Sequence, residues 1–235
     1  MTTFVLVHGG WHGAWCWQRV AALLRADGHE VHAPDLSGHG DNHHRNAADI
    51  NLSTHIDDVV NLLRSHDLTD VVLAGHSYGG NVITGAADAE PGRIARLVYL
   101  DGHVPADGQS CWDLAPEFRD FFIEGAAAGG GVWVPSIPAA MFNVNEADRK
   151  MVDELCRPMP LATLVERIRL TGAGAAIPRT FVWTSGWDPN PFLQFRDRNA
   201  DDPLWTVVEA PTGHDVMLDD PDLTARLLTS ATVPA

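Results

Sequence analysis

Short apolar runs recur along the chain and alternate with segments that have the spacing of amphipathic helices. The runs predict buried strands at 4–7, 30–34, 71–74, 96–101, 180–183 and 204–209. The segments between them place apolar residues three or four positions apart, as in Val20, Leu23 and Leu24. Because strands that alternate with helices favour right-handed crossovers, we expect an α/β fold with about six parallel strands flanked by helices.

The alternation breaks between residues 105 and 178, where irregular segments are rich in Trp, Phe, Met, Gly and Pro. This stretch comes directly after the fourth predicted strand. Ligands of parallel sheets bind at the carboxyl ends of the strands, so we expect the stretch to form a lid over that edge. The prediction is a core of residues 1–104 and 179–235 and a lid of residues 105–178.

The third strand runs into the pentapeptide Gly75-His76-Ser77-Tyr78-Gly79, and a helix-compatible segment follows it. A serine on such a tight strand-to-helix turn projects its hydroxyl clear of the sheet, while glycines on either side prevent a collision at the corner. The plain alternative is a glycine-rich turn with an incidental serine. The strand before the motif and the helix after it favour a nucleophile at Ser77.

A serine nucleophile needs a base, and the base needs a carboxylate that orients it. The chain has 12 histidines, and His214 is the one between the last predicted strand and the last helix, so we expect it to be the base. Two aspartates follow strands and suit the acid. We favour Asp188, after the penultimate strand, because of its place in the order Ser, Asp, His, and keep Asp101 as the alternative.

A tetrahedral intermediate needs two N–H donors that face its oxyanion. We expect the backbone N–H groups of Tyr78, at the start of the helix, and of Gly10, after the first strand. His8 is expected to brace that loop. No helical His-x-x-x-His pair or cysteine partner accompanies the adjacent His43 and His44, so we expect no metal.

Composition narrows the function further. The chain has 235 residues, a net charge of −15 and a pI near 5.0, which argues against nucleic acid and anionic membranes as partners. The length fits one domain. Three cysteines without a Cys-x-x-Cys motif indicate no disulfide framework. The first strand starts directly after the N-terminus, and no apolar run approaches membrane-spanning length, so we expect no signal peptide and a cytoplasmic location.

Four motifs carry a family likeness: residues 8–17, residues 35–40, residues 75–80, and Gly213 with His214. Together they resemble the α/β-hydrolase superfamily. Within it, the chain is similar to the small branch of plant methyl-salicylate and methyl-jasmonate esterases, hydroxynitrile lyases and bacterial esterases. The resemblance implies ester hydrolysis by Ser77, His214 and an acid, without a cofactor.

Two positions separate the branches of this group. Where the lyases of the group carry a threonine and a lysine, this chain has Gly9 and Asp215. A lysine there stabilises departing cyanide and an aspartate repels it, so both departures favour an esterase. The loop at 185–188 looks one residue longer than in the plant proteins, which leaves the choice between Asp188 and Asp101 open.

Aromatic residues in the predicted lid and beside the first-strand loop indicate an apolar binding site. The candidates for substrate binding are Trp11, Trp112, Phe121, Phe122, Trp133 and Phe142. The alternative for each of them is a place in the lid's own core. We expect a small apolar or aromatic ester as the partner, for example a methyl ester or a lactone of a secondary metabolite.

Three rival functions stay open. The first is a lyase that uses the same site, as in cyanohydrin cleavage or an elimination. The second is a tailoring reaction on a biosynthetic ester or lactone, and the third is a ligand receptor that keeps the hydrolase fold. Intact Ser77 and His214 count against a receptor, because a binder does not need them. A homodimer also stays open.

Overall fold

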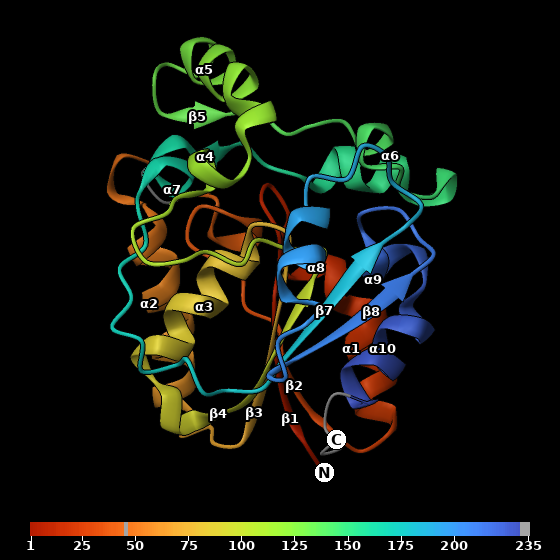
Figure 1. Cartoon of the computed structure of the whole chain (residues 1–235). Coiled ribbons are helices and arrows are strands. Elements are labelled where there is room, and N and C mark those ends of the chain that lie inside the picture. Colours follow the sequence, from red (N-terminus) through yellow and green to blue (C-terminus); the bar gives the residue numbers. More distant parts are fainter. Residues whose placement is uncertain (45–46, 231–235) are drawn as a thin grey trace.

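The computed structural model describes residues 1–44 and 47–230; the end of the predicted core, 231–235, lies outside the described residues. Its main sheet has six strands, all parallel, in the order β2-β1-β3-β4-β7-β8. The predicted α/β architecture with six parallel strands is therefore confirmed (Figure 1). The strands are β1 (Thr3–Val7), β2 (Glu30–His32), β3 (Val71–His76), β4 (Ile94–Leu100), β7 (Arg179–Thr184) and β8 (Trp205–Ala210).

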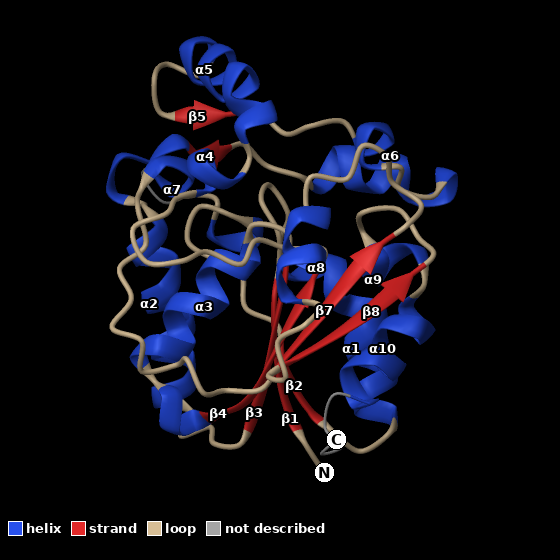
Figure 2. Ribbon diagram, in the orientation of Figure 1, coloured by secondary structure: helices blue, strands red, loops and turns tan. Residues whose placement is uncertain are grey.

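Helices cover both faces of the sheet (Figure 2). α1 and α10 pack together on one face, and α2 and α3 pack together on the other. The core helices are α1 (Gln18–Ala26), α2 (Leu52–Ser65), α3 (Gly79–Ala89), α8 (Leu193–Asn199), α9 (Val216–Asp219) and α10 (Pro221–Ser230). Because helices cover both faces, the central strands are mainly apolar, and every residue of β3 is buried.

The parallel register brings the carboxyl ends of the central strands to one edge of the sheet. Val7 of β1 pairs with Gly75 of β3, and Gly75 pairs with Tyr99 of β4. Residues that follow β1, β3 and β4 therefore leave the sheet next to one another. This edge is where a parallel sheet binds its ligand.

The segment between β4 and β7 places four helices above that edge (Figures 1 and 2). They are α4 (Cys111–Leu114), α5 (Arg119–Ala128), α6 (Glu146–Leu155) and α7 (Leu161–Val165), with an antiparallel pair of strands, β5 (Trp133–Val134) and β6 (Met159–Pro160). Residues 166–178 leave this layer and return along α3, where the Thr171 amide donates to the Asp88 carboxylate at 2.6 Å. We call the upper layer, residues 105–165, the roof.

Short 3-10 helices join several of these elements: η1 (Ala14–Trp17), η2 (Gly40–Asn42), η3 (Ala47–Asp49), η4 (Pro91–Arg93), η5 (Pro116–Phe118) and η6 (Ala139–Phe142). All three cysteines are free and buried. Among the described residues, no helix combines the length and the apolar character that crossing a bilayer requires.

Candidate active site

Ser77 lies on the turn between β3 and α3, with a backbone φ of +52° that side chains rarely adopt. The two flanking glycines explain how the turn fits. A Cβ on Gly75 would lie 2.7 Å from the Gly79 carbonyl oxygen, and a Cβ on Gly79 would lie 2.7 Å from the His8 carbonyl oxygen. The geometry therefore has the form of a nucleophile elbow.

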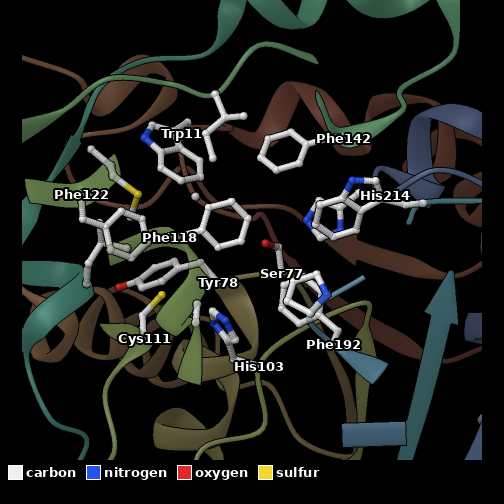
Figure 3. A pocket seen from close by; sticks show the side chains of 17 residues that line it. Trp11, Ser77, Tyr78, His103, Cys111, Phe118, Phe122, Phe142, Phe192 and His214 are labelled. Carbon is white, nitrogen blue, oxygen red and sulfur yellow. The ribbon is translucent and has the colours of Figure 1, made fainter. Parts of the chain in front are cut away.

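His214 lies between β8 and α9, beside Ser77 at the same cavity (Figure 3). Its side chain is buried, and its Nδ1 is 2.8 Å from Oδ2 of Asp101. Because a carboxylate only accepts, Nδ1 carries the proton and Nε2 is left as the basic nitrogen. Aromatic rings hold the imidazole, and Phe192 stacks on it at 5.2 Å with an interplanar angle of 5°.

The carboxylate beside His214 belongs to Asp101, so the preference for Asp188 is corrected in favour of the alternative. Asp101 is fully buried at the end of β4, whereas Asp188 is exposed. The Thr184 amide donates to Asp101 at 3.2 Å, the Thr184 hydroxyl at 2.8 Å and the Asn190 amide at 2.9 Å. With His214, these donors saturate the carboxylate and hold it in place.

The loop after β7 explains why Asp188 faces away. It turns Trp187 and Asn190 inward, and both are buried, while Asp188 between them faces solvent. Trp187 then packs on His214 with ring centroids 4.5 Å apart. The loop that was expected to supply the acid instead supplies a donor to Asp101, from Asn190, and an aromatic wall beside His214, from Trp187.

Gly10 and Tyr78, the predicted oxyanion donors, both line the cavity with Ser77. No described group accepts a hydrogen bond from either backbone N–H. The Gly10 carbonyl is held by Nδ1 of His12 at 2.8 Å, and a Cβ on Gly10 would lie 3.1 Å from the Met159 sulfur. His8 braces the loop, because its Nδ1 bonds the Gly9 carbonyl at 2.8 Å.

A buried ion pair lies beneath the site. Nε2 of His12 is 3.0 Å from Oδ2 of Asp215, and both side chains are almost fully buried. Burial alone would lower the pKa of His12, but Cys156 and Asp215 outweigh it and raise that pKa well above its usual value. Burial alone would raise the pKa of Asp215, yet His12 keeps it low. The pair thus connects the loop of Gly10 to the residue after His214.

The cavity above Ser77 has a volume of about 40 Å³ and is walled mainly by apolar side chains from the roof (Figure 3). Its lining residues are Gly10, Trp11, Ser77, Tyr78, His103, Cys111, Ala115, Phe118, Phe122, Ile137, Phe142, Met159, Leu164, Trp187, Pro191, Phe192 and His214. None of these side chains is Lys, Arg, Asp or Glu. The described wall of the cavity is therefore mainly apolar.

Of the predicted substrate-binding residues, Trp11, Phe122 and Phe142 line this cavity, and three do not. Trp112 packs against Phe122 with centroids 6.5 Å apart, and Phe121 packs against Trp11 at 6.3 Å. Trp133 lines a separate surface pocket at the antiparallel strand pair. These three side chains therefore lie in the second layer or on another face of the roof, away from the cavity wall.

Phe118, His103 and Phe192 line the cavity and were not anticipated. Phe118 stands in a 3-10 turn, where helical spacing says nothing about direction. The sequence position of His103 could have predicted its place at the cavity, because it comes two residues after Asp101 at the carboxyl end of a buried strand. Phe192 had no such signal, because its place depends on the fold of the loop after β7.

One group of described residues has the spacing of a metal site: the ligand atoms of His76, His214 and Asp215 lie within 4.8 Å of one another. All three are buried, and each already has a protein partner. Nδ1 of His214 donates to Asp101, Nε2 of His76 bonds the His214 carbonyl at 3.0 Å, and Asp215 pairs with His12. Nδ1 of His76 and Oδ1 of Asp215 are buried without a hydrogen-bond partner. We assign no metal to these residues.

The sequence profile described as "Alpha/beta hydrolase family" matches residues 4–227. The chain belongs to this family. Its sheet order, nucleophile elbow and strand-end histidine all fit the match.

Among the relatives of this hydrolase is "Carbendazim hydrolyzing esterase" from Nocardioides sp. (strain SG-4G), which is 43% identical over 239 residues. The match covers 97% of this chain and 98% of the relative. "Methylesterase 1" from Arabidopsis thaliana is 41% identical over 104 residues, but the match covers only 43% of this chain and 40% of the relative. With such relatives and this fold, the hydrolase is a carboxylic ester hydrolase.

A solved structure with a similar fold is an extracellular α/β-hydrolase from a Paenibacillus species, which shares structural and functional homology with tobacco salicylic acid binding protein 2. It superposes with a TM-score of 0.86 at 27% identity and covers 98% of this chain and 99% of its own. Tomato methylketone synthase I has a TM-score of 0.81 at 24% identity, with 97% and 96% of the two chains covered, and shows the fold alone.

Gly9 and Asp215, the two positions at which this hydrolase differs from the lyases, both have close neighbours in the structure. A Cβ on Gly9 would lie 2.7 Å from Nδ1 of His76 and 3.0 Å from Cβ of Ser77, so a threonine there would collide with the elbow. Asp215 does not line the cavity, because it pairs with His12 below it. The expectation that Asp215 repels a leaving anion is therefore corrected: its role is in the buried ion pair.

Proposed function

We propose that the protein is a serine carboxylesterase that acts through an acyl-Ser77 intermediate. The observation that carries the proposal is the buried hydrogen bond from His214 to Asp101 beside the strained Ser77. Such a serine, with a histidine fixed in one tautomer, has the parts of a nucleophile, a base and an orienting acid. An esterase relative at 43% identity over nearly the whole chain supports the same reaction.

The reaction proceeds in two halves. Oγ of Ser77 attacks the ester carbonyl while Nε2 of His214 takes its proton, and the N–H groups of Gly10 and Tyr78 stabilise the oxyanion. The tetrahedral intermediate then collapses, the bond to the alcohol breaks, and His214 gives its proton to the departing oxygen. Water repeats the sequence on the acyl-enzyme, which releases the acid and restores Ser77. Asp101 stabilises the imidazolium that forms in each half.

The substrate we propose is a small, uncharged ester with an apolar or aromatic group, such as a methyl ester. The support is the narrow cavity, whose described lining side chains carry no ionised acid, lysine or arginine. An ionised group buried there would lose its hydration without a partner. We expect methyl butyrate and methyl benzoate to be hydrolysed far faster than monomethyl succinate. Carbendazim belongs in the same comparison because a similar relative is named for it.

Active-site labelling tests the mechanism. We expect a fluorophosphonate to form one adduct, on Ser77, and p-nitrophenyl acetate and butyrate to be turned over. Ser77→Ala should stay folded and lose at least about 10⁴-fold in kcat, as in other serine hydrolases. The exposed Ser185 offers a matched control, and Ser185→Ala should keep its activity. Turnover by folded Ser77→Ala would rule out the mechanism.

A further inference from the structure

His103 is a side chain of the cavity that the reaction described above does not use. It follows Asp101 and Gly102 at the end of β4, and its backbone N–H donates to the Ser77 carbonyl at 3.0 Å. Its ring is almost fully buried and lines the cavity. Figure 3 shows His103 on the opposite side of Ser77 from His214.

The hydrogen bonds around His103 fix which ring nitrogen carries the proton. Nδ2 of Asn81 donates to the Tyr78 carbonyl at 3.1 Å, which sets the orientation of the amide, and it also contacts Nδ1 of His103 at 3.0 Å. Because an amide nitrogen only donates, Nδ1 is the acceptor. Burial lowers the pKa of His103 to about 3, so the ring is neutral at pH 7 and carries its proton on Nε2.

The ring is also held in one orientation by packing. Phe192 lies 5.0 Å from it and Phe195 lies 6.1 Å from it, centroid to centroid. No described residue accepts a hydrogen bond from Nε2 of His103. This atom is also absent from the group of fully buried side-chain atoms that lack a hydrogen-bond partner, so it is accessible from the cavity. The Nε2–H group therefore faces the cavity as a free donor.

The other polar side chains of the wall are already satisfied. The indoles of Trp11 and Trp187 each donate to a backbone carbonyl, at 3.1 and 2.8 Å, and the Tyr78 hydroxyl bonds a buried histidine at 3.0 Å. Cys111 has only a weak S–H donor. Apart from Ser77 and His214, His103 is thus the one described lining residue with a strong side-chain donor that has no partner.

We propose that His103 is a specificity-determining residue, which donates a hydrogen bond from Nε2 to an acceptor atom in the acyl group of the substrate. The inference rests on the proposed esterase function. His214 must protonate the departing alcohol, so the alcohol lies on the side of His214 and the acyl group extends to the other side of Ser77, where His103 lies. The preferred acyl group is then apolar with one acceptor, such as an ether or carbonyl oxygen or a ring nitrogen, near the ester carbonyl.

A pair of isosteric esters tests this. p-Nitrophenyl methoxyacetate differs from p-nitrophenyl butyrate by an ether oxygen in place of one methylene. We would measure the ratio of kcat/KM for methoxyacetate to that for butyrate in the wild type, in His103→Phe and in His103→Gln. Comparison between variants cancels the difference in intrinsic reactivity of the two esters. We expect the ratio to fall about tenfold in His103→Phe, the value of one neutral hydrogen bond, and to recover in part in His103→Gln, whose amide keeps a donor.

Each outcome has one meaning. A ratio that stays within twofold in His103→Phe would overturn the inference while the esterase function stands. Absence of fluorophosphonate labelling and of turnover in the wild type would overturn the esterase function and this inference with it. If His103→Phe fails to fold, ¹⁵N spectra of the wild-type ring decide, because a proton on Nδ1 instead of Nε2 would contradict the proposal.

Discussion

The residues that follow β1, β3 and β4 form what we call the floor of the cavity. The floor and the roof are built by different physical means. At the floor, three residues that follow strands have backbone angles that side chains rarely adopt: Trp11 at φ +64°, Ser77 at +52° and Asp101 at +42°. Among the non-glycine residues of the described roof, only Asn143 does so, and asparagine tolerates this region. The roof is held by the packing of aromatic rings from short helices, such as Phe118 on Phe122 at 6.2 Å.

This difference assigns separate tasks to the two regions. A strained backbone conformation persists only where the surrounding hydrogen bonds and close contacts hold it in place. The same contacts fix the positions of the side chains that we expect to react. Apolar packing fixes shape and volume, and it tolerates exchanges that keep both. Substitutions in the floor should therefore lower kcat or stability, whereas substitutions in the roof should change KM.

The largest effect should come from the carboxylate of the floor. Asp101→Asn keeps the shape but presents an amide to His214 and favours the wrong tautomer, so we expect kcat to fall by about 10⁴-fold. Asp188→Asn is the matched control, and its kcat should stay within about twofold, as expected for an exposed side chain away from the site. The reverse result would return the acid role to Asp188. Steady-state rates with p-nitrophenyl acetate measure both.

Asp215→Asn should have the next largest effect, on stability. It leaves His12 buried without its charge partner, which should lower the free energy of unfolding by about 3 kcal/mol. The effect should depend on pH. The pKa of His12 is raised in the folded state, so its contribution is complete below about pH 6.5 and is lost as the pH rises through the raised value.

The pKa of Asp215 is lowered in the folded state, so its contribution is complete above about pH 4 and is lost as the pH falls through the lowered value. The difference between wild type and Asp215→Asn should therefore be greatest between about pH 4 and 6.5 and smaller in alkaline solution. Denaturant unfolding at pH 5.5 and 9.5 measures this. An equal difference at both values would show that His12 and Asp215 do not form a charged pair.

A smaller loss is expected at Gly79, the second residue after the proposed nucleophile. Gly79→Ala puts a Cβ 2.7 Å from the His8 carbonyl oxygen, and the strands or the helix must shift to admit it. We expect a loss of about 1–3 kcal/mol in the free energy of unfolding, together with a loss of activity. A Cβ on Gly92 meets nothing within 4 Å, so Gly92→Ala serves as the control. Equal stability of the two variants would contradict the steric account of the elbow.

The floor and the roof also differ in how well the sequence predicts them. The position of Ser77 on a tight strand-to-helix turn could be predicted, because the steric requirements of that turn are local and leave glycines at 75 and 79. The choice between Asp101 and Asp188 could not be made, because it depends on how the loop after β7 folds. That loop turns Asn190 inward onto Asp101 and leaves Asp188 outside.

In the roof, the sequence predicted that the cavity wall is apolar but identified only some of the residues that line it. Phe122 and Phe142 reach the cavity, while Trp112 lies behind Phe122. Elements of two to ten residues fix no long helical face, so spacing cannot tell the inner side of the roof from the outer. The positions of residues on the cavity wall were therefore harder to predict than the position of Ser77 on its turn.

The smallest effect should come from the roof. Phe118→Leu keeps an apolar side chain of similar size on the cavity wall, so we expect kcat on p-nitrophenyl butyrate to stay within about twofold and KM to rise by about three- to tenfold. Phe121→Leu is the matched control one layer back, where Phe121 packs on Trp11 without lining the cavity, and its KM should change less. A fall in kcat as large as that of Asp101→Asn would mean that the roof also positions the reacting atoms. A change confined to KM would mean that its aromatic side chains select the substrate and leave the chemistry to the floor.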